Sequence, residues 1–189
     1  MSNKVKFGLK NAYYALLTES TQGVISYGAP VRLPGAVSLS LSPEGDHSRF
    51  YADDGVYFTI FDNNGYTGSL ELALIPDSFR TDVLKETADA KDVLLEKSGV
   101  TGARFALLFE FTGDANQVKH VFYNCTASRP DVASSTKGES TEVQTETINI
   151  DAGPALFNGN YYVKGKTTDS TDATVFSSWY TTVHTPAAS

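Results

Sequence analysis

Apolar residues alternate with polar ones along much of the chain, which is the periodicity of strands that bury one face. The pattern is clearest in three segments: 37–42 (VSLSLS), 70–74 (LELAL) and 105–111 (FALLFEF). Further strands are predicted for residues 121–125, for the uniformly apolar run 56–61, and for the long polar run 141–150, which is rich in β-formers. The sequence therefore predicts a mainly β protein whose strands are mostly antiparallel.

A different pattern interrupts the strands after residue 75. Pro76 is followed by capping residues, as at a helix N-terminus, and Phe79 and Val83 are spaced by four. This predicts one short helix that begins near Pro76. The run Asp89 to Asp92 then predicts a turn before a further strand.

Polar stretches predict loops at 128–140 and 167–173. No repeat divides the chain, so residues 1–189 are expected to form a single domain. The segment 168–189 is expected to be an arm or an added strand, because residues 175–183 (VFSSWYTTV) are aromatic and β-branched. Both this segment and the 128–140 loop have little apolar area, and we expect them to order on contact with a neighbouring molecule.

Composition limits the function classes. The 189 residues include 41% hydrophobic ones, enough for a core. The 22 acidic and 15 basic residues give a net charge of −7, which disfavours stable binding to nucleic acid. The start MSNKVKFGLK has no apolar signal region, and no segment approaches the roughly 20 apolar residues of a membrane span, so we expect a soluble protein made in the cytoplasm.

The string Tyr51 to Gly55 reads YADDG, and a Tyr-x-Asp-Asp run can hold two magnesium ions in a polymerase. Such a site needs a third carboxylate on a neighbouring strand and a basic groove that holds the template. The acidic composition of this sequence does not indicate such a groove. Asp53 and Asp54 are therefore interpreted as a bend or bulge before the run 56–61. The run 62–65 (DNNG) lacks the alternating ligands and closing glutamate of a calcium loop and is interpreted as a turn.

Other catalytic motifs are absent from the sequence: there is no phosphate loop ending in Lys-Ser/Thr, no GxSxG and no HExxH. Cys125 is the single cysteine and is expected to pack as a small apolar residue. His47, His120 and His184 have no metal or triad spacing. We therefore expect no catalytic residue, no metal site and no cofactor. An enzyme with aspartates that converge in the fold, and a carbohydrate-binding β-sandwich with exposed aromatic residues, stay open as alternatives.

Several strings in one order resemble the major tail proteins of long-tailed, non-contractile phages of Gram-positive hosts. The likeness covers roughly residues 6 to 150 and is carried by these strings: 8–14 (GLKNAYY), 32–37 (RLPGAV), 51–55 (YADDG), 64–66 (NGY), 73–83 (ALIPDSFRTDV), 105–111 (FALLFEF) and 123–127 (YNCTA).

The resemblance implies a tail-tube subunit with an antiparallel β-sandwich or barrel-like fold and one short flanking helix. It also implies that six copies form a ring and that rings stack into a tube through which DNA passes without sticking. The implied partners are further copies of the chain and the tape-measure, tail-terminator and distal tail proteins. The implied location is the virion tail, assembled in the host cytoplasm without a membrane partner.

Polar residues that alternate along the predicted strands are candidates for a wet face toward a lumen or an interface. If six copies kept the formal charge, a ring would carry 6 × −7 = −42, and a lumen sharing that charge would repel phosphates. The candidates are Ser38, Ser40, Ser42, Ser69, Glu71, Glu142, Gln144 and Glu146.

Overall fold

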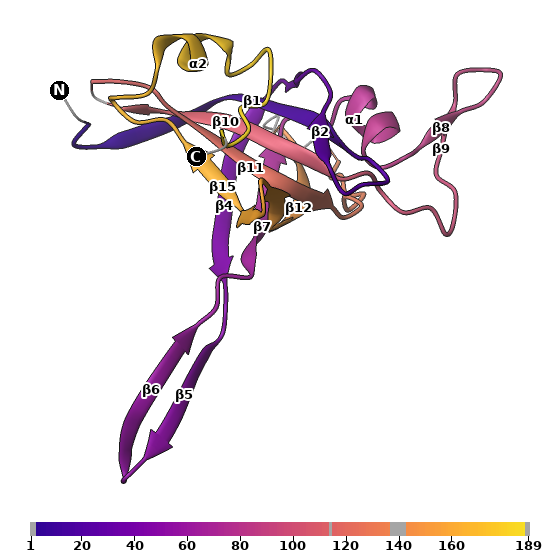
Figure 1. The fold of residues 1–189 in the computed structure, drawn as a ribbon. Coiled ribbons are helices and arrows are strands. Elements are labelled where there is room, and N and C mark those ends of the chain that lie inside the picture. Colours follow the sequence, from indigo (N-terminus) through magenta and orange to yellow (C-terminus); the bar gives the residue numbers. More distant parts are fainter. Residues whose placement is uncertain (1–2, 114, 137–142, 188–189) are drawn as a thin grey trace.

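A large antiparallel sheet organises the protein (Figure 1). The computed structural model describes residues 3–113, 115–136 and 143–187. The sheet has nine strands in the order β2-β1-β10-β11-β12-β7-β4, with β3 beside β1 and β15 beside β11. The predicted mainly β, antiparallel fold is confirmed, although the described residues form two short helices where one was expected.

The elements follow one another along the chain as β1 (Lys6–Glu19), β2 (Ile25–Tyr27), β3 (Val31–Leu33), β4 (Ala36–Glu44), β5 (His47–Ala52), β6 (Gly55–Phe61), β7 (Gly65–Leu72), α1 (Asp77–Asp82), β8 (Thr87–Ala88), β9 (Leu94–Leu95), β10 (Phe105–Gly113), β11 (Val118–Ala127), β12 (Glu146–Gly153), β13 (Ala155–Phe157), β14 (Asn160–Tyr162), β15 (Lys164–Lys166) and α2 (Ala173–Ser178). Over the described residues, no helix has the length and apolar character needed to cross a membrane.

The central strand β10 is buried on both faces, because its alternate residues enter two different apolar clusters. Phe105 and Leu107 belong to an inner core with Leu70 of β7 and Ile148 of β12. Since that core contains residues from strands at both ends of the sheet, the sheet curls around it in a barrel-like manner. Ala106 and Leu108 point the other way into an outer core.

Helix α1 closes the inner core. Phe79 is fully buried and packs edge-to-face on Tyr14 and Phe105, with ring centroids 5.2 and 5.6 Å apart. The Tyr14 hydroxyl donates a hydrogen bond of 2.8 Å to Asp82 at the end of the helix. Burial first, and the nearby Asp82 carboxylate second, raise the pKa of Tyr14 to about 12. The predicted short helix is therefore confirmed, and so is the turn that follows it, which lies between β8 and β9.

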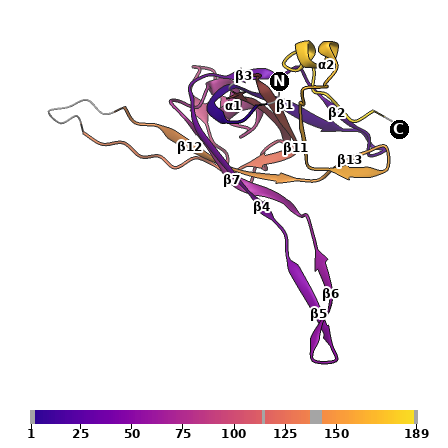
Figure 2. The same cartoon turned by 90° about the vertical axis from the view of Figure 1, so that its left-hand side faces the viewer.

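The segment that contains α2 covers the outer face of the sheet (Figure 2). Asp172 caps the helix by accepting hydrogen bonds from the backbone amides of Thr174 and Val175. Trp179 is only 3% exposed and donates from its indole nitrogen to the carbonyl of His120. The strand considered for residues 175–183 is thus wrong: the chain forms a helix and a turn there, because its apolar residues are taken up by the outer core of the same molecule.

A pair of buried charges holds this covering segment. Glu110 and Lys119 are opposite each other on β10 and β11, and they are 2% and 7% exposed. Glu110 accepts hydrogen bonds from the Asn11 amide (2.8 Å) and the Tyr180 hydroxyl (2.9 Å). The Lys119 ammonium donates to the carbonyl of Phe176 (2.7 Å) and lies over its ring. Each charge therefore has partners that offset the cost of its burial.

Strand β1 bends because it contains two irregularities in its pairing with β10. Gly8 and Asn11 lie at these points with φ of 67° and 50°, a region that glycine and asparagine tolerate best. Extra residues at such bulges turn the strand. One long strand can therefore pair with β10, β2 and β3.

The antiparallel pair β5 and β6 projects from the sheet as an arm (Figure 1). This corrects the interpretation of residues 62–65 as a hairpin turn. The chain instead runs through residues 62–64 without a turn, and the amide of Asn64 bonds to the carbonyl of Glu44 where the arm returns to β7. The tight turn lies at the far end of the arm. Residues 141–142 of the strand predicted for 141–150 lie outside the described part of the chain. Residues 143–145 are not in a strand, and β12 runs from Glu146 to Gly153.

We predict that Trp179→Ala lowers the free energy of unfolding of the isolated protein by about 3 kcal/mol or more, because it leaves a large cavity in the outer core. Urea denaturation followed by circular dichroism measures this. Val132→Ala is the control, since Val132 is fully exposed. Equal stability of the two variants would mean that residues 173–183 dock on another molecule and not on their own sheet.

Candidate assembly surface

The strands β4, β7 and β12 present one continuous polar face. In the register of the sheet, Ser38, Ser40 and Ser42 of β4 lie opposite Glu71, Ser69 and Thr67 of β7. The same β7 residues lie opposite residues 147, 149 and 151 of β12. The intervening residues are apolar and enter the inner core. Alternation along the three strands therefore separates a wet face from a buried one.

Side-chain hydrogen bonds cross this polar face from strand to strand. Glu71 accepts from the hydroxyls of Thr145 and Ser38, both at 2.7 Å. These two hydrogen bonds, the one from Thr145 first, lower the pKa of the Glu71 carboxyl. Thr67 donates to Asp151 at 2.6 Å. Hydrogen bonds thus hold both carboxylates in place on the polar face.

Five of the eight residues predicted for a wet face lie together here: Ser38, Ser40, Ser42, Ser69 and Glu71. Gln144 is exposed just before β12, and Glu142 lies outside the described residues.

Glu146 lies on the opposite side from the polar face. It is opposite Leu72, and its carboxylate accepts from the Ile75 amide (2.6 Å) and pairs with Arg80 at 3.0 Å. Its role in the structure is to connect β12 to the residues around α1. The sequence already indicates this placement. Glu146 lies two and four residues before Ile148 and Ile150, so all three point to the same side of β12, and the two isoleucine side chains are buried.

The three strands of the polar face carry carboxylates and no basic side chain. Their sequences are AVSLSLSPE, GYTGSLEL and ETINIDAG, so they contain four acidic residues and neither lysine nor arginine. Strand β4 is the last strand of the sheet on this side, and among the described strands it pairs with β7 alone. Its outer edge therefore offers backbone groups to a further strand.

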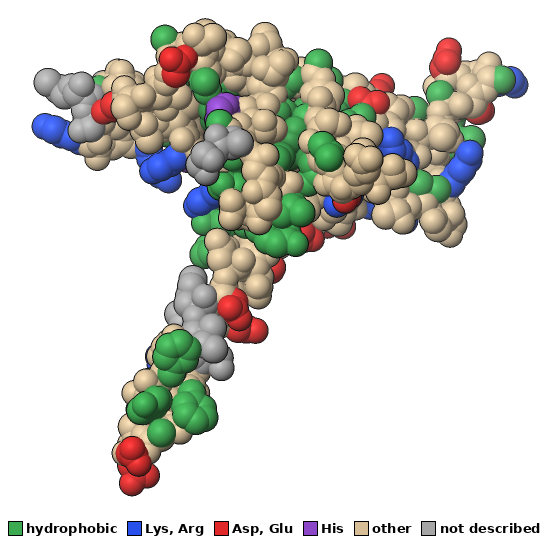
Figure 3. All heavy atoms as spheres, in the orientation of Figure 1, with side chains coloured by type: hydrophobic (Ala, Val, Ile, Leu, Met, Phe, Trp, Pro, Cys, Tyr) green, Lys and Arg blue, Asp and Glu red, His purple; other side chains and the backbone are tan. Residues whose placement is uncertain are grey.

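The arm formed by β5 and β6 exposes aromatic side chains to solvent (Figure 3). Phe50, Tyr51, Tyr57 and Phe58 are each about three-fifths exposed or more, and Phe50 packs edge-to-face on Tyr57 with centroids 6.4 Å apart. Large exposed apolar patches mark interaction sites in soluble proteins. The sequence predicts a strand at 56–61 but not its projection from the sheet, because both strands of the arm have ordinary β composition.

The aspartates of the YADDG string form the tip of the arm. Ala52 pairs with Gly55, and the two residues between them, Asp53 and Asp54, have φ of 52° and 61°. Two positive φ values in a two-residue loop define a type I′ hairpin turn, which favours Asp, Asn and Gly. The bend predicted at these aspartates is therefore confirmed as a turn at the end of a hairpin.

A basic pocket lies around His120 of β11. Lys166 of β15 is opposite His120 in the register, and Lys6 lies over the ring of Phe111 at 4.9 Å. His120 itself stacks on Phe109, with parallel rings 5.2 Å apart. Burial, followed by the charges of Lys166, Lys164 and Lys6, lowers the pKa of His120 to about 4. The imidazole is therefore neutral in a site of positive potential.

This basic pocket could not be seen in the sequence. Its lysines alternate in two separate short strings, KVK at residues 4–6 and KGK at 164–166. Alternation puts Lys164 and Lys166 on one face of β15, whereas Lys6 begins β1 and Lys4 lies just before it. The pairing of β15 with β11 then brings the second string to His120, and that pairing is between segments more than 40 residues apart.

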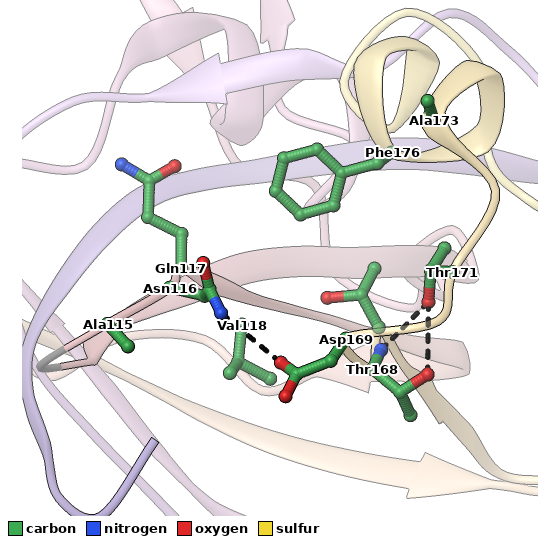
Figure 4. A pocket seen from close by; sticks show the side chains of 10 residues that line it. Ala115, Asn116, Gln117, Val118, Thr168, Asp169, Thr171, Ala173 and Phe176 are labelled. Atoms are coloured by element: carbon green, nitrogen blue, oxygen red, sulfur yellow. Dashed lines mark hydrogen bonds between the residues drawn. The ribbon is translucent and has the colours of Figure 1, made fainter. Parts of the chain in front are cut away.

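A cavity lies between the β10–β11 loop and the segment before α2 (Figure 4). It has a volume near 560 Å³ and is lined mainly by threonine and amide side chains, with Phe176 on one side. Asp169 is the one ionisable side chain among its described lining residues, and it accepts from the Asn116 amide at 3.3 Å. An acid-base pair for catalysis is therefore not assembled from these residues.

Within the described residues, no three side chains of His, Cys, Asp or Glu are grouped so that they could hold a metal ion. Cys125 is fully buried, as predicted, and burial raises the pKa of its thiol to about 12. A thiol held neutral in this way is a poor nucleophile.

No protein-family model matches the chain, and no curated protein matches it. Among solved structures, one described as "Cryo-EM structure of the anti-feeding prophage cap (AFP tube terminating cap)" is similar over 87% of this chain and 93% of that chain. The two share 12% sequence identity, with a TM-score of 0.45. A similarity at this level does not assign a function.

We predict that NMR titration of the folded protein gives a pKa of about 4 for His120 and that Lys166→Ala raises it. Since the unfolded chain takes up this proton near pH 6.5, the protein should lose stability as the pH falls from about 6.5 toward 4. Lys97→Ala, remote from His120 in the fold, is the control. An unchanged His120 titration in Lys166→Ala would contradict the described arrangement of charges.

Proposed function

We propose that this chain is a structural subunit of a phage tail tube, in which six copies close into a ring and rings stack into a hollow tube that conducts DNA. The observation that carries the proposal is the polar face of β4, β7 and β12, which lacks basic residues and ends at the open edge of β4. The resemblance of several sequence strings to major tail proteins supports the same assignment.

Ring closure follows from the chemistry of the sheet edge. An open edge has unpaired amide and carbonyl groups, and a soluble protein with a long exposed edge risks uncontrolled aggregation. Cyclic assembly of identical subunits satisfies each edge with the next copy and leaves none over. In the proposed ring, β4 of one copy joins the sheet of its neighbour, so that the polar faces together line the lumen.

The charge of the polar face suits a conduit for DNA. Glu71 and Asp151 repel phosphates, and the absence of lysine and arginine on the three strands removes the contacts that would retain them. At 0.1 M salt the repulsion extends about 10 Å from the wall. A DNA molecule would therefore be kept away from the wall, and the water between them would allow it to slide.

The arm supplies the apolar contact that ring stacking needs. A two-stranded hairpin is at best marginally stable alone in water. The aromatic side chains of Phe50, Tyr57 and Phe58 would be buried if the arm packed on another copy. Burial of about 25 cal/mol per Å² of apolar surface would then stabilise both the arm and the assembly.

The finer assignments are part of the same proposal. The tube would have the tape-measure protein inside it during assembly, and the tail-terminator and distal tail proteins at its ends. It would be located in the virion and assembled in the host cytoplasm. The subunit would act without catalytic residues or a cofactor.

We predict that the purified protein forms rings and tubes with increasing concentration, visible by negative-stain microscopy. A variant in which residues 47–61 are replaced by Asn-Gly should stay folded and monomeric. The replacement is short enough because the Asp62 amide already bonds to the Asp46 carbonyl at 3.3 Å, so a two-residue turn spans the gap. If the full protein stays monomeric at every concentration, or binds glycans as a monomer, the tube assignment is wrong.

We also predict that the double variant Glu71→Lys and Asp151→Lys assembles into tubes but slows DNA ejection from virions. The new ammonium groups would bind the phosphates that the wild-type face repels. The variant Asp92→Lys and Asp131→Lys makes the same change in net charge on exposed loops and should eject DNA normally. Ejection kinetics followed with a DNA-binding dye distinguish the two, and equal rates would place the polar face elsewhere than in the lumen.

A further inference from the structure

We propose that the basic pocket around His120 receives the acidic tip of the β5–β6 arm of a second copy of this chain. The inference rests on the proposed self-assembly and goes beyond it by specifying which two surfaces meet. The tip is Asp53 and Asp54, and the pocket is lined by Lys6, Lys166 and His120.

Two carboxylates of the tip and two lysines of the pocket have no ion-pair partner among the described residues. Asp53 and Asp54 take part in no hydrogen bond or ion pair with any described residue. Between residues 44 and 62 the arm has five carboxylates and one arginine. In the pocket, neither Lys6 nor Lys166 has a carboxylate within ion-pair distance among the described residues. Two such surfaces of one molecule attract each other between copies.

The pocket also has an apolar character that suits this partner. Its volume is near 340 Å³. Val5, Phe111 and Val118 provide apolar walls beside the lysines. The tip has the same mixture, because Tyr51 and Val56 flank the two aspartates and are 61% and 52% exposed.

The occupant must come from another copy. In both views of the fold the arm extends away from the sheet, so its tip does not approach the pocket of its own chain (Figures 1 and 2). A nucleic acid would also be attracted by the lysines, but the net charge of −7 opposes its approach. A second copy brings one complementary tip for every pocket, and it adds apolar contacts that a phosphate backbone lacks.

The charged residues of the tip determine how the two copies align more than how tightly they bind. Exposed ion pairs contribute little each, while charge complementarity excludes wrong pairings and guides association. The apolar walls of the pocket and the aromatic residues of the arm would supply most of the surface area that is buried between the two copies. Contact between tip and pocket would therefore fix how far one copy is rotated relative to the next.

Cross-linking between two cysteine variants tests the inference. Gly55→Cys adds a thiol at the tip and keeps both aspartates, and Val5→Cys adds one at the pocket wall and keeps every lysine. Cys125 does not compete because it is fully buried. A disulfide forms when the two Cα atoms approach within about 7 Å. We expect covalent dimers when the two variants are mixed under mild oxidation.

The matched control mixes Gly55→Cys with Val93→Cys. Val93 is about as exposed as Val5, but it lies in the segment between β8 and β9. Equal yields from the two mixtures, or no dimer from either, would overturn the inference. Adding Asp53→Asn and Asp54→Asn to the tip variant should reduce the yield roughly fivefold, as expected for the loss of two exposed ion pairs. Asparagine keeps the turn, since it tolerates positive φ.

Microscopy of the same samples separates this inference from the proposed function. Tubes without tip-to-pocket cross-links would leave the tube assignment intact and refute the docking site. Cross-linked pairs without rings or tubes would support the docking site and contradict the tube. If a single-stranded oligonucleotide occupies the pocket and no cross-link forms, the pocket is a nucleic-acid site and the inference fails.

Discussion

Burial of β10 on both of its faces is the constraint on which the rest of the structure depends. A strand covered on both sides needs an apolar layer above and below it, and this chain makes the two layers from different parts of its sequence. The inner layer uses α1 and the curl of the sheet toward β7 and β12. The outer layer uses β13 and the segment that contains α2. The sheet is thereby held rigid at its centre.

That rigidity leaves the peripheral strands available for contacts with other molecules. On β4, β7 and β12 the inner core takes one set of alternate residues, and the other set stays polar. The arm emerges from the same two strands, β4 and β7, that form this end of the sheet (Figure 1). An interaction surface built on such strands keeps its shape when it meets a partner, which lowers the entropy lost on association.

The sequence predicted those features that depend on neighbours along the chain. Period-two alternation identified the strands at 37–42 and 105–111, and the spacing of Phe79 and Val83 identified α1. The strand predicted at 70–74 is only partly confirmed, because β7 begins at Gly65 and ends at Leu72. Five of the residues expected on a wet face do lie on one polar face, although whether it lines a lumen stays a prediction.

What the sequence did not predict depends on pairings between distant segments. Whether residues 56–61 belong to the main sheet or to an arm is decided by the segment they pair with, since both arrangements need the same residue types. The helix at Ala173–Ser178 has β-favouring residues, and burial on the outer face overrides that local preference. The misplacement of Glu146 has a local cause instead. The polar residues before β12 suggested that Glu146 continues their face, although it lies on the same side of the strand as Ile148.

The outer layer has a consequence for the order of events during synthesis. The part of the outer layer that contains α2 comes after every strand of the sheet in the chain. Until that segment has been synthesised, part of the outer apolar surface of the nascent sheet is uncovered. During this interval the nascent protein is vulnerable to misfolding, and a chaperone bound to that surface would protect it.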